Sequence, residues 1–297
     1  MPSPIATAAG TVASLHRYPI KSMMGEELEV AQVIERGIVG DRGYAFVDAE
    51  TGKVVSAKNP RKWARMFECE AAYVEPPEQG KALPPVRVTL PGGESVTSAD
   101  SGFDAAVSKF LGREVTLTPT ASQMPIIDHF WFDYQTPLGR EVENPEGDSL
   151  TTVPIGFGAP GTFFDYTPLH ILTTSTLNKL RVLYPDGQWE VRRFRPNIVI
   201  EAAAGADGFV EDAWIGRELT AGEVSLKVID TMVRCVMTTL PQGDLPNDPG
   251  ILRTVADHHR VLMPAVGREL HAVGVAVTVT AGGRISRGDA LAVQAGE

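Results

Sequence analysis

Cys235 is the residue in this sequence with the clearest capacity for metal chemistry. It lies in the segment Val-Arg-Cys-Val-Met-Thr-Thr, which we interpret as an apolar strand over residues 234–238. A thiolate is a soft ligand that suits transition metals, and a cation such as Arg234 favours the thiolate form. Because neighbours in a strand face opposite ways, Arg234 is expected to act through the backbone neighbourhood. A single strand cysteine is more often a small buried hydrophobic residue, so the local sequence leaves both interpretations open.

A second candidate is the segment Arg-Phe-Arg-Pro-Asn over residues 193–197. Interpreted as a strand, it places Arg193, Arg195 and Asn197 on one face. Guanidinium groups offer forked donors that match phosphate, and an amide offers the donor and acceptor that a heterocycle edge requires. The alternative is a solvated charged face on an edge strand, which Pro196 permits.

Further residues could bind an anion. Lys21, Ser22 and Arg42 would form a compact phosphate clamp, although Lys and Arg usually serve solubility at the surface. The hydroxyls of Thr174 and Ser175 lie at an expected helix start, where free backbone N–H groups attract anions. An ordinary N-cap, with Ser175 capping a helix over residues 176–183, explains those hydroxyls equally well.

The other cysteine and the histidines are interpreted as structural residues and not as metal ligands. Cys69 is expected to be structural, and His170 is interpreted as a core histidine. His258 and His259 are adjacent instead of four residues apart, so they do not form a two-histidine metal face.

Composition limits the kinds of partner. The chain has 297 residues with 27 Lys and Arg against 37 Asp and Glu, a formal charge of −10 that gives no general attraction to nucleic acid or anionic lipid. Two cysteines exclude a disulfide framework and four-cysteine iron–sulfur ligation within this chain. No apolar run approaches the ~20 residues of a membrane span, and no signal peptide is apparent at the N-terminus, so a cytoplasmic location is expected.

The elements that must position these residues are mostly strands. Without regular strand–helix alternation, the pattern predicts a β-rich α+β fold with a barrel-like core. Strands are expected over residues 12–18, 28–34, 44–47, 54–57, 86–90, 94–96, 115–117, 169–172, 197–201, 224–229, 234–238, 270–279 and 290–293. Helices are expected over residues 103–111 and 176–183, and from an Asp248 cap to about residue 262. The segment 118–168 is expected to be irregular, and its aromatic group could form a lid or a self-packed loop: His129, Phe130, Trp131, Phe132 and Tyr134.

Several motifs occur in a telling order: Tyr-Pro-Ile-Lys-Ser, Gly-Asp-Arg, Arg-Phe-Arg-Pro-Asn-Ile-Val-Ile, Glu-Asp-Ala-Trp, Arg-Cys-Val-Met-Thr-Thr and Gly-Gly-Arg-Ile-Ser-Arg-Gly-Asp. Together they resemble the MOSC family, in particular its branch with an N-terminal MOSC β-barrel, which includes the mitochondrial amidoxime-reducing component and bacterial relatives. The resemblance implies an N-terminal MOSC-type β-barrel or α+β region over residues 1–125, whose first strands could pack with the second domain, and a MOSC domain over residues 126–297.

The resemblance also implies a molybdenum–molybdopterin cofactor with Cys235 as the metal ligand and catalytic residue. The cofactor-contacting positions would be Lys21, Ser22, Arg42, Thr174, Ser175, Arg195, Asn197 and Arg234. The segment 118–168 and the stretch after Thr239 depart from the expected pattern of this branch, which leaves substrate access open.

Two functions follow from the resemblance. The first is a molybdenum-dependent oxidoreductase that reduces N-hydroxylated or other N-oxygenated small molecules. Since no flavin, dinucleotide or iron–sulfur motif is present, its electrons would come from a separate ferredoxin or flavin reductase. The alternative is a carrier or transferase of sulfur or molybdenum cofactor that uses Cys235 as a persulfide or ligand.

Overall fold

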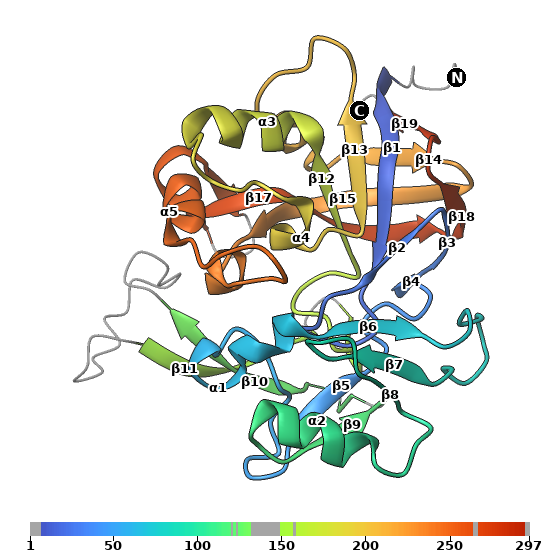
Figure 1. The fold of residues 1–297 in the computed structure, drawn as a ribbon. Helices are drawn as coiled ribbons and strands as arrows, with labels where there is room; N and C mark the ends of the chain where they lie inside the picture. The colour runs from blue at the N-terminus through green and yellow to red at the C-terminus, as the bar shows by residue number, and fades with distance from the viewer. Residues whose placement is uncertain are drawn as a thin grey trace.

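A closed barrel of seven strands forms the upper body in Figure 1. The computed structural model describes residues 7–119, 121–122, 124–131, 149–156, 159–263 and 267–294. Neighbouring barrel strands pair in the order β12-β13-β1-β19-β14-β15-β17, and β17 closes the ring by pairing with β12. Their bounds are β1 Thr7–Arg17, β12 Leu169–Thr173, β13 Ile198–Ala202, β14 Glu218–Ala221, β15 Val224–Val233, β17 Arg268–Ala281 and β19 Ala290–Val293. The predicted β-rich α+β fold with a barrel core is therefore confirmed.

Alternating burial explains why these segments form barrel strands. In β15, Val224, Leu226 and Val228 are almost fully buried, and the residues between them are less buried. Such period-two patterns put one face of each strand into the core. The register of β15 against β17 shifts at three places, and irregularities of this kind bend strands enough to close a barrel.

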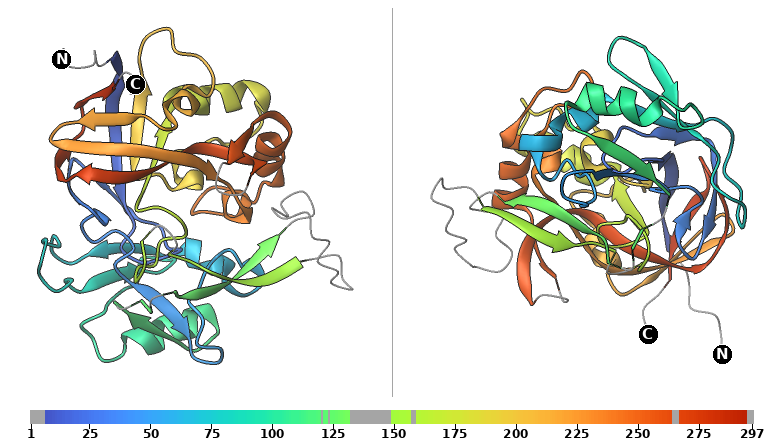
Figure 2. Two further views of the ribbon diagram at one scale, coloured as in Figure 1. Left: turned by 180° about the vertical axis from the view of Figure 1, so that it is seen from behind. Right: turned by 90° about the horizontal axis from the view of Figure 1, so that it is seen from below.

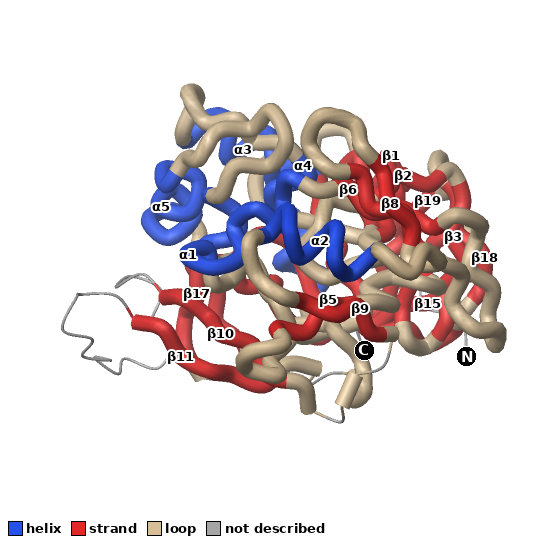
Figure 3. Tube along the Cα trace, turned by 60° about the horizontal axis from the view of Figure 1, so that its bottom comes forward, coloured by secondary structure: helices blue, strands red, loops and turns tan. Residues whose placement is uncertain are grey.

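Helices cover one side of the barrel, as the blue segments of Figure 3 show. The core between α3, α5 and the barrel contains Leu177, Trp189, Phe194 and Ile251. The elements on this side are α3 Thr174–Leu183, α4 Val191–Phe194, η3 Val210–Trp214, η4 Val236–Thr239 and α5 Pro249–His258. No helix in the described ranges is long and apolar enough to cross a membrane.

A lower body lies beneath the barrel and has its own core (Figures 1 and 2). Helix α2 contributes Phe103, Val107 and Leu111 to this core, and Gly112 ends the helix with φ of 70°. The lower body consists of β5 Ala45–Asp48, α1 Pro60–Trp63, η1 Ala64–Glu68, β6 Glu70–Tyr73, β7 Val86–Thr89, β8 Ser95–Thr97, α2 Phe103–Leu111, β9 Val115–Thr118, β10 Ile126–Trp131 and β11 Ser149–Pro154. The other strands flank the barrel: β2 Glu26–Leu28, β3 Val30–Ile34, β4 Gly37–Ile38, β16 Arg260–Met263 and β18 Gly283–Ser286.

The expectation of an irregular segment over residues 118–168 was wrong in its described part. Strands β10 and β11 form an antiparallel pair there. Backbone bonds join this pair to the lower body, because Val54 N donates to Ile126 O and Phe130 N donates to Lys58 O. Phe132 and Tyr134 lie outside the described residues, as does the side chain of Trp131, so the lid or packed-loop alternatives stay a prediction.

The two bodies exchange segments at their boundary. The first strand of the chain, β1, lies in the barrel between β13 and β19, and β3 pairs with β18. Conversely, β10 and β11 lie beyond residue 125 and pack with the lower body. The division at residue 125 stays a prediction; the described contacts place strands from each side of it in the opposite body.

Candidate functional site

A cavity of about 750 Å³ opens between the two bodies. This volume is within the usual range for small-molecule and cofactor sites. It brings together most of the residues singled out from the sequence, namely Lys21, Ser22, Arg42, Arg195, Asn197, Arg234 and Cys235. The structure adds Lys58 and Asp165 to the same lining, which also contains His129 from the segment expected as a lid or packed loop.

Cys235 lies two residues after Val233, the last residue of β15, instead of within a strand. The predicted strand over residues 234–238 was wrong, because Cys235 has extended φ and ψ of −136° and −178° and the 3-10 helix η4 begins at Val236. The backbone N–H and hydroxyl of Thr238 both donate to the carbonyl of Cys235, at 3.1 and 3.0 Å. The turn replaces the ladder bonds that a strand would make, and it leaves the Cys235 thiol partly exposed and without a disulfide.

Cys235 also touches both bodies. It packs against an apolar cluster that includes Met24, Phe67 and Phe130 from the lower body and Met237 from η4. Its place at this junction lets it face the cavity while the chain around it is held by packing.

Arg193 does not share a strand face with Arg195. The predicted strand was wrong here too, since residues 191–194 form α4 and Arg195 ends it in the left-handed conformation. The fully buried guanidinium of Arg193 donates to four backbone carbonyls: those of Gln188 (2.8 Å), Thr238 (3.1 Å), Leu240 (3.3 Å) and Pro246 (3.0 Å). Arg193 therefore fastens the segment that follows Cys235 to α4.

Arg42 and Arg195 lie against the ring of Tyr18. Their guanidinium carbons are 4.6 and 4.2 Å from its centroid, which is cation–π contact. Arg195 Nη1 also donates to Met23 O at 2.6 Å. Burial, followed by the charge of Arg42, lowers the pKa of Arg195 to about 10. Both residues line the cavity, so this part of its wall carries two positive charges.

Asn197 holds this wall together through both ends of its amide. Its Nδ2 donates to Asp41 Oδ2 at 2.8 Å and to His16 O at 3.3 Å. Its Oδ1 accepts from the backbone N–H of His170 at 3.2 Å and from Arg42 Nη1 at 3.4 Å. Asp41 in turn accepts from Arg42. Although Asn197 lines the cavity, the structure uses its amide to orient Arg42.

Three non-glycine residues have positive φ among the described residues, and all three line the cavity. They are Ser22 (65°), Arg42 (46°) and Arg195 (52°). A left-handed L-residue costs roughly 1–2 kcal/mol, and strained backbone is found disproportionately at functional sites. This observation is independent of any motif and points to the same residues.

Lys21, Asp165 and Lys58 form an ion-pair chain in the cavity wall. Lys21 Nζ is 2.6 Å from Asp165 Oδ1, Lys58 Nζ is 3.2 Å from Asp165 Oδ2, and Lys21 also donates to Phe163 O at 2.8 Å. Burial lowers the pKa of Lys21 to about 8, against the opposing charge of Asp165. Burial opposes ionisation of Asp165, yet the two lysines hold the pKa of its carboxyl far below the ordinary value. For Lys58, burial is outweighed by Asp165 and Cys235, which raise its pKa.

Sequence reasoning missed Lys58 and Asp165. Lys58 lies in a turn before α1, and Asp165 lies in the connection to β12. Nothing in either local pattern distinguishes them from surface charges, because the ion pair joins distant segments. Lys58 lines the same cavity as Cys235 and so adds a further cation to the lining that contains the thiol.

The hydrogen bonds of Arg234 indicate whether the cavity suits an anionic group. Its Nη2 donates to Phe194 O at 2.7 Å, but its buried Nε has no hydrogen-bond partner among the described residues. Burial lowers its pKa to about 10, while Cys235 raises it. A buried donor without a partner is costly, so an acceptor in the cavity would relieve that cost. The donor set therefore fits a group that combines a soft metal with anionic oxygens.

Thr174 and Ser175 are not brought to the cavity. The hydroxyl of Thr174 accepts from Ala202 N at 3.2 Å, and that of Ser175 donates to Gly208 O at 2.8 Å. The helix cap is Thr173, whose hydroxyl accepts from Thr176 N, so the expected Ser175 cap was wrong. Their role as cofactor contacts stays a prediction, and neither residue contributes to the proposals below.

Two histidines line the cavity. His170 is buried and its Nε2 donates to Val273 O at 3.0 Å, in agreement with a core role. Burial lowers the pKa of both His170 and His129 well below the ordinary value, so both rings are neutral. Cys69 is buried in the lower core, where burial raises the pKa of its thiol to about 12.

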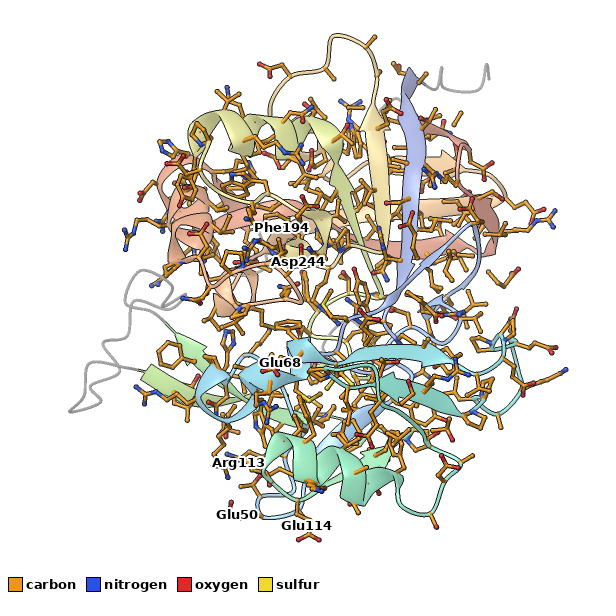
Figure 4. All side chains as sticks on the ribbon, in the orientation of Figure 1. Glu50, Glu68, Arg113, Glu114, Phe194 and Asp244 are labelled. Carbon is orange, nitrogen blue, oxygen red and sulfur yellow. The ribbon has the colours of Figure 1, made fainter. Side chains whose placement is uncertain are left out.

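A smaller hollow of about 300 Å³ lies at the far end of the lower body. Glu50, Arg113 and Glu114 line it, and Figure 4 shows these three far from Phe194, which borders the main cavity. It contains none of the residues discussed above.

Two family models match the chain. The MOSC N-terminal beta barrel domain matches residues 9–113, and the MOSC domain matches residues 159–292. The chain belongs to the MOSC family, with both of these domains. The matched regions of this MOSC protein include Lys21, Ser22 and Arg42 in the first, and Arg195 and Cys235 in the second.

Relatives of this MOSC protein include amidoxime-reducing components. Mitochondrial amidoxime-reducing component 1 of Mus musculus is 27% identical over 247 residues, which cover 78% of this chain and 66% of that protein. Mitochondrial amidoxime reducing component 2 of Homo sapiens is 25% identical, with 78% and 67% covered. The chain thus spans about two thirds of the length of these relatives. The solved YuaD protein from Bacillus subtilis aligns over 99% of this chain and 100% of its own at 10% identity, with a TM-score of 0.47.

Proposed function

We propose that this chain binds a molybdenum–molybdopterin cofactor in the cavity between its two bodies and reduces N-oxygenated small molecules. MOSC domains are associated with this cofactor, and the relatives above are named for amidoxime reduction. The observation that carries the proposal is that one cavity joins a partly exposed thiol to the cations Lys21, Arg42, Lys58, Arg195 and Arg234. The electrons would come from a separate ferredoxin or flavin reductase.

The cavity residues would hold the cofactor in two ways. Cys235 would ligate the metal through its sulfur, in the same cavity that Arg234 and Lys58 line. The paired guanidinium groups of Arg42 and Arg195 would bind its anionic oxygens, because forked donors suit phosphate. Arg42 and Arg195 are already oriented by Tyr18 and by backbone carbonyls, so little side-chain entropy would be lost on binding.

The bound cofactor would supply two-electron redox chemistry: the N–O bond breaks as two electrons and two protons are taken up, and the oxygen leaves as water. The chain's own residues would hold the protons and exclude water. Lys58 Nζ, which pairs with Asp165 Oδ2 at 3.2 Å, would hold a proton in the same cavity as Cys235. Residues of β10 and β11 line the cavity on one side and residues of the barrel on the other, which limits the access of water to these charges.

Replacement of the two cysteines tests the metal-ligand role. Both Cys235→Ala and Cys69→Ala are expressed in a host that makes the cofactor, and molybdenum per chain is measured with the rate of benzamidoxime reduction. We expect Cys235→Ala to lose the activity and most of the metal, because no other thiol lines the described cavity. Cys69→Ala should keep both, since Cys69 lies in the core of the lower body.

Full activity of Cys235→Ala would contradict the proposal. A persulfide on Cys235 in wild-type protein that contains no molybdenum would instead favour the alternative function of a sulfur carrier. Mass spectrometry of the intact chain distinguishes the persulfide by its added sulfur.

A further inference from the structure

A buried histidine holds the backbone of Arg234, the residue before Cys235. This residue, His271, lies in β17, is 2% exposed, and is not among the described residues that line the cavity. Its Nε2 is 2.9 Å from Arg234 O, and because a carbonyl oxygen only accepts hydrogen bonds, the ring proton must be on Nε2. Arg234 N in turn donates to His271 O at 3.1 Å. One histidine thus binds both the N–H and the carbonyl of the residue that precedes the thiol.

The chain leaves the barrel sheet at this point. The pairing of β15 with β17 ends where Val233 lies opposite Ala272, and η4 begins at Val236. Arg234 and Cys235 therefore lie between the last strand pair and the first residue of η4. Because the peptide unit that joins them is planar, fixing the Arg234 carbonyl also fixes the direction in which the chain enters Cys235.

The chain after Cys235 is fixed by other bonds. Thr238 donates twice to the carbonyl of Cys235, and Arg193 donates to the carbonyls of Thr238 and Leu240. These bonds hold the side of Cys235 that leads into η4 and leave the preceding side to His271. A residue that binds or reacts must be held within about 0.5 Å of its productive geometry, so support from both sides is expected for such a position.

The ring of His271 has no competing hydrogen bond among the described residues. Its Nδ1 is buried and has no partner there. Burial lowers the pKa of His271 to about 4, although the bond to Arg234 O opposes the shift. The ring is therefore neutral at neutral pH, and its one proton lies on Nε2. Since a buried nitrogen without a partner costs stability, the bond to Arg234 O is the contact that explains a histidine at this position.

From these contacts we infer that His271 is a positioning residue for Cys235, because its bond to Arg234 O sets where the Cys235 side chain lies in the cavity lining. His271 acts through the backbone and not by contact with a ligand. The inference rests on the proposed function for the use of the Cys235 sulfur as a metal ligand. The position of the thiol is a property of the chain by itself, so it can be tested separately.

Two replacements of His271 separate the hydrogen bond from the packing of the ring. His271→Phe keeps a planar ring and removes the donor, whereas His271→Gln keeps a nitrogen donor at the end of the side chain. The matched control is His259→Phe. His259 is also buried, and its Nδ1 donates to Ala272 O at 2.6 Å. The control therefore loses a bond from a buried ring to a backbone carbonyl in the same region, and the bond to Arg234 O stays.

The first measurement is the rate at which a thiol reagent modifies Cys235 in the cofactor-free chain. Every chain carries Cys69→Ala, so that Cys235 is its single thiol. His271→Phe should react about fivefold faster than the parent chain, because loss of this hydrogen bond makes local opening around Cys235 more frequent. His271→Gln and His259→Phe should react at the parent rate. An unchanged rate for His271→Phe, or an equal increase for His259→Phe, overturns the inference.

The second measurement uses the molybdenum-loaded chain. In His271→Phe the electron paramagnetic resonance spectrum of molybdenum(V) should change, and kcat for benzamidoxime should fall at least about tenfold with KM unchanged. His271→Gln should keep the wild-type spectrum. A wild-type spectrum and kcat for His271→Phe overturn the inference and leave the reductase proposal standing. Wild-type chain without molybdenum overturns the proposed function, and the thiol rates then decide the role of His271 by themselves.

A measurement on the wild type covers the case in which His271→Phe does not fold, as judged by circular dichroism. Nitrogen NMR of the histidine rings reports which nitrogen of His271 carries the proton. A proton on Nε2 that exchanges slowly with water supports the inference. A proton on Nδ1 overturns it, because Nε2 could then not donate to Arg234 O.

Discussion

Arg193 and Arg192 offer a test of how the segment after Cys235 is held in place. They are neighbours in α4, yet Arg193 is fully buried and Arg192 forms a surface ion pair with the exposed Asp244. The perturbation is the same in both positions, Arg193→Met and Arg192→Met. Methionine keeps an unbranched chain but removes every hydrogen-bond donor.

The expected losses in the free energy of unfolding differ because Arg193 donates to backbone carbonyls and Arg192 does not. Arg193→Met leaves four carbonyls without their guanidinium donor, and two of these, Thr238 O and Leu240 O, are in buried contacts. A buried acceptor left unsatisfied costs about 1–3 kcal/mol, so Arg193→Met should lose about 2–6 kcal/mol. Arg192→Met removes an exposed ion pair, which is worth about 0–1 kcal/mol.

Equilibrium urea unfolding followed by tryptophan fluorescence measures both losses. Trp189 stacks on Phe194 within α4, with ring centroids 6.1 Å apart, and so reports on this neighbourhood. Reaction of Cys235 with a thiol reagent gives a second measurement, which should be faster in Arg193→Met because its bonds to Thr238 and Leu240 are lost. Equal free energies of unfolding for the two variants, with equal thiol reactivity, would refute the assignment of Arg193 as the fastener.

Two further predictions concern the cavity wall. Burial lowers the pKa of Lys21 from 10.5 to about 8 in the folded protein. At pH values between these two, the unfolded chain therefore binds more protons than the folded chain does. The free energy of unfolding should consequently rise by about 2 kcal/mol from pH 8 to pH 10. Lys21→Met should lack that part of the rise, and parallel wild-type and variant curves from urea unfolding at each pH would contradict the shift. Ser22→Gly should be about 1 kcal/mol more stable than Ser22→Ala. Both variants lose the hydroxyl that accepts from Ala57 N, but only glycine tolerates φ of 65° without strain. Thermal unfolding of the two variants measures the difference, and a more stable alanine variant would argue against the left-handed conformation.

Turns and helix ends were predictable because their causes are local. Gly112 ends α2 in the left-handed conformation, and Asp248 caps α5 by accepting from Gly250 N at 2.9 Å. Between the strands expected over residues 44–47 and 54–57 the chain turns back, with Asp48 N donating to Lys53 O, although Val54 forms only an isolated bridge with Val47. The end of α5 was placed too late, because its last residue is His258 and the chain then enters β16 to pair with β17. That pairing is not visible in the local pattern of residues 259–262.

The candidate site was predictable only as a set of residue types. The sequence pattern predicted one strand face for Arg193, Arg195 and Asn197. In the structure each has a different role, since Arg193 binds carbonyls, Arg195 lies on Tyr18, and Asn197 orients Arg42. These roles depend on contacts between segments far apart in the chain, which periodicity cannot encode. Asp165 and Lys58 were missed for the same reason.

Backbone strain gives an argument for the site that does not depend on the motifs. Ser22, Arg42 and Arg195 each take a left-handed conformation that glycine would adopt at lower cost. Together the three cost roughly 3–6 kcal/mol, a sizeable share of the roughly 5–15 kcal/mol that stabilises a typical domain. Glycine in place of Arg42 or Arg195 would remove the strain but also the guanidinium group that lies on Tyr18. The chain thus keeps two strained cations in the lining of one cavity, an arrangement that costs stability and is explained if their charges serve the site proposed above.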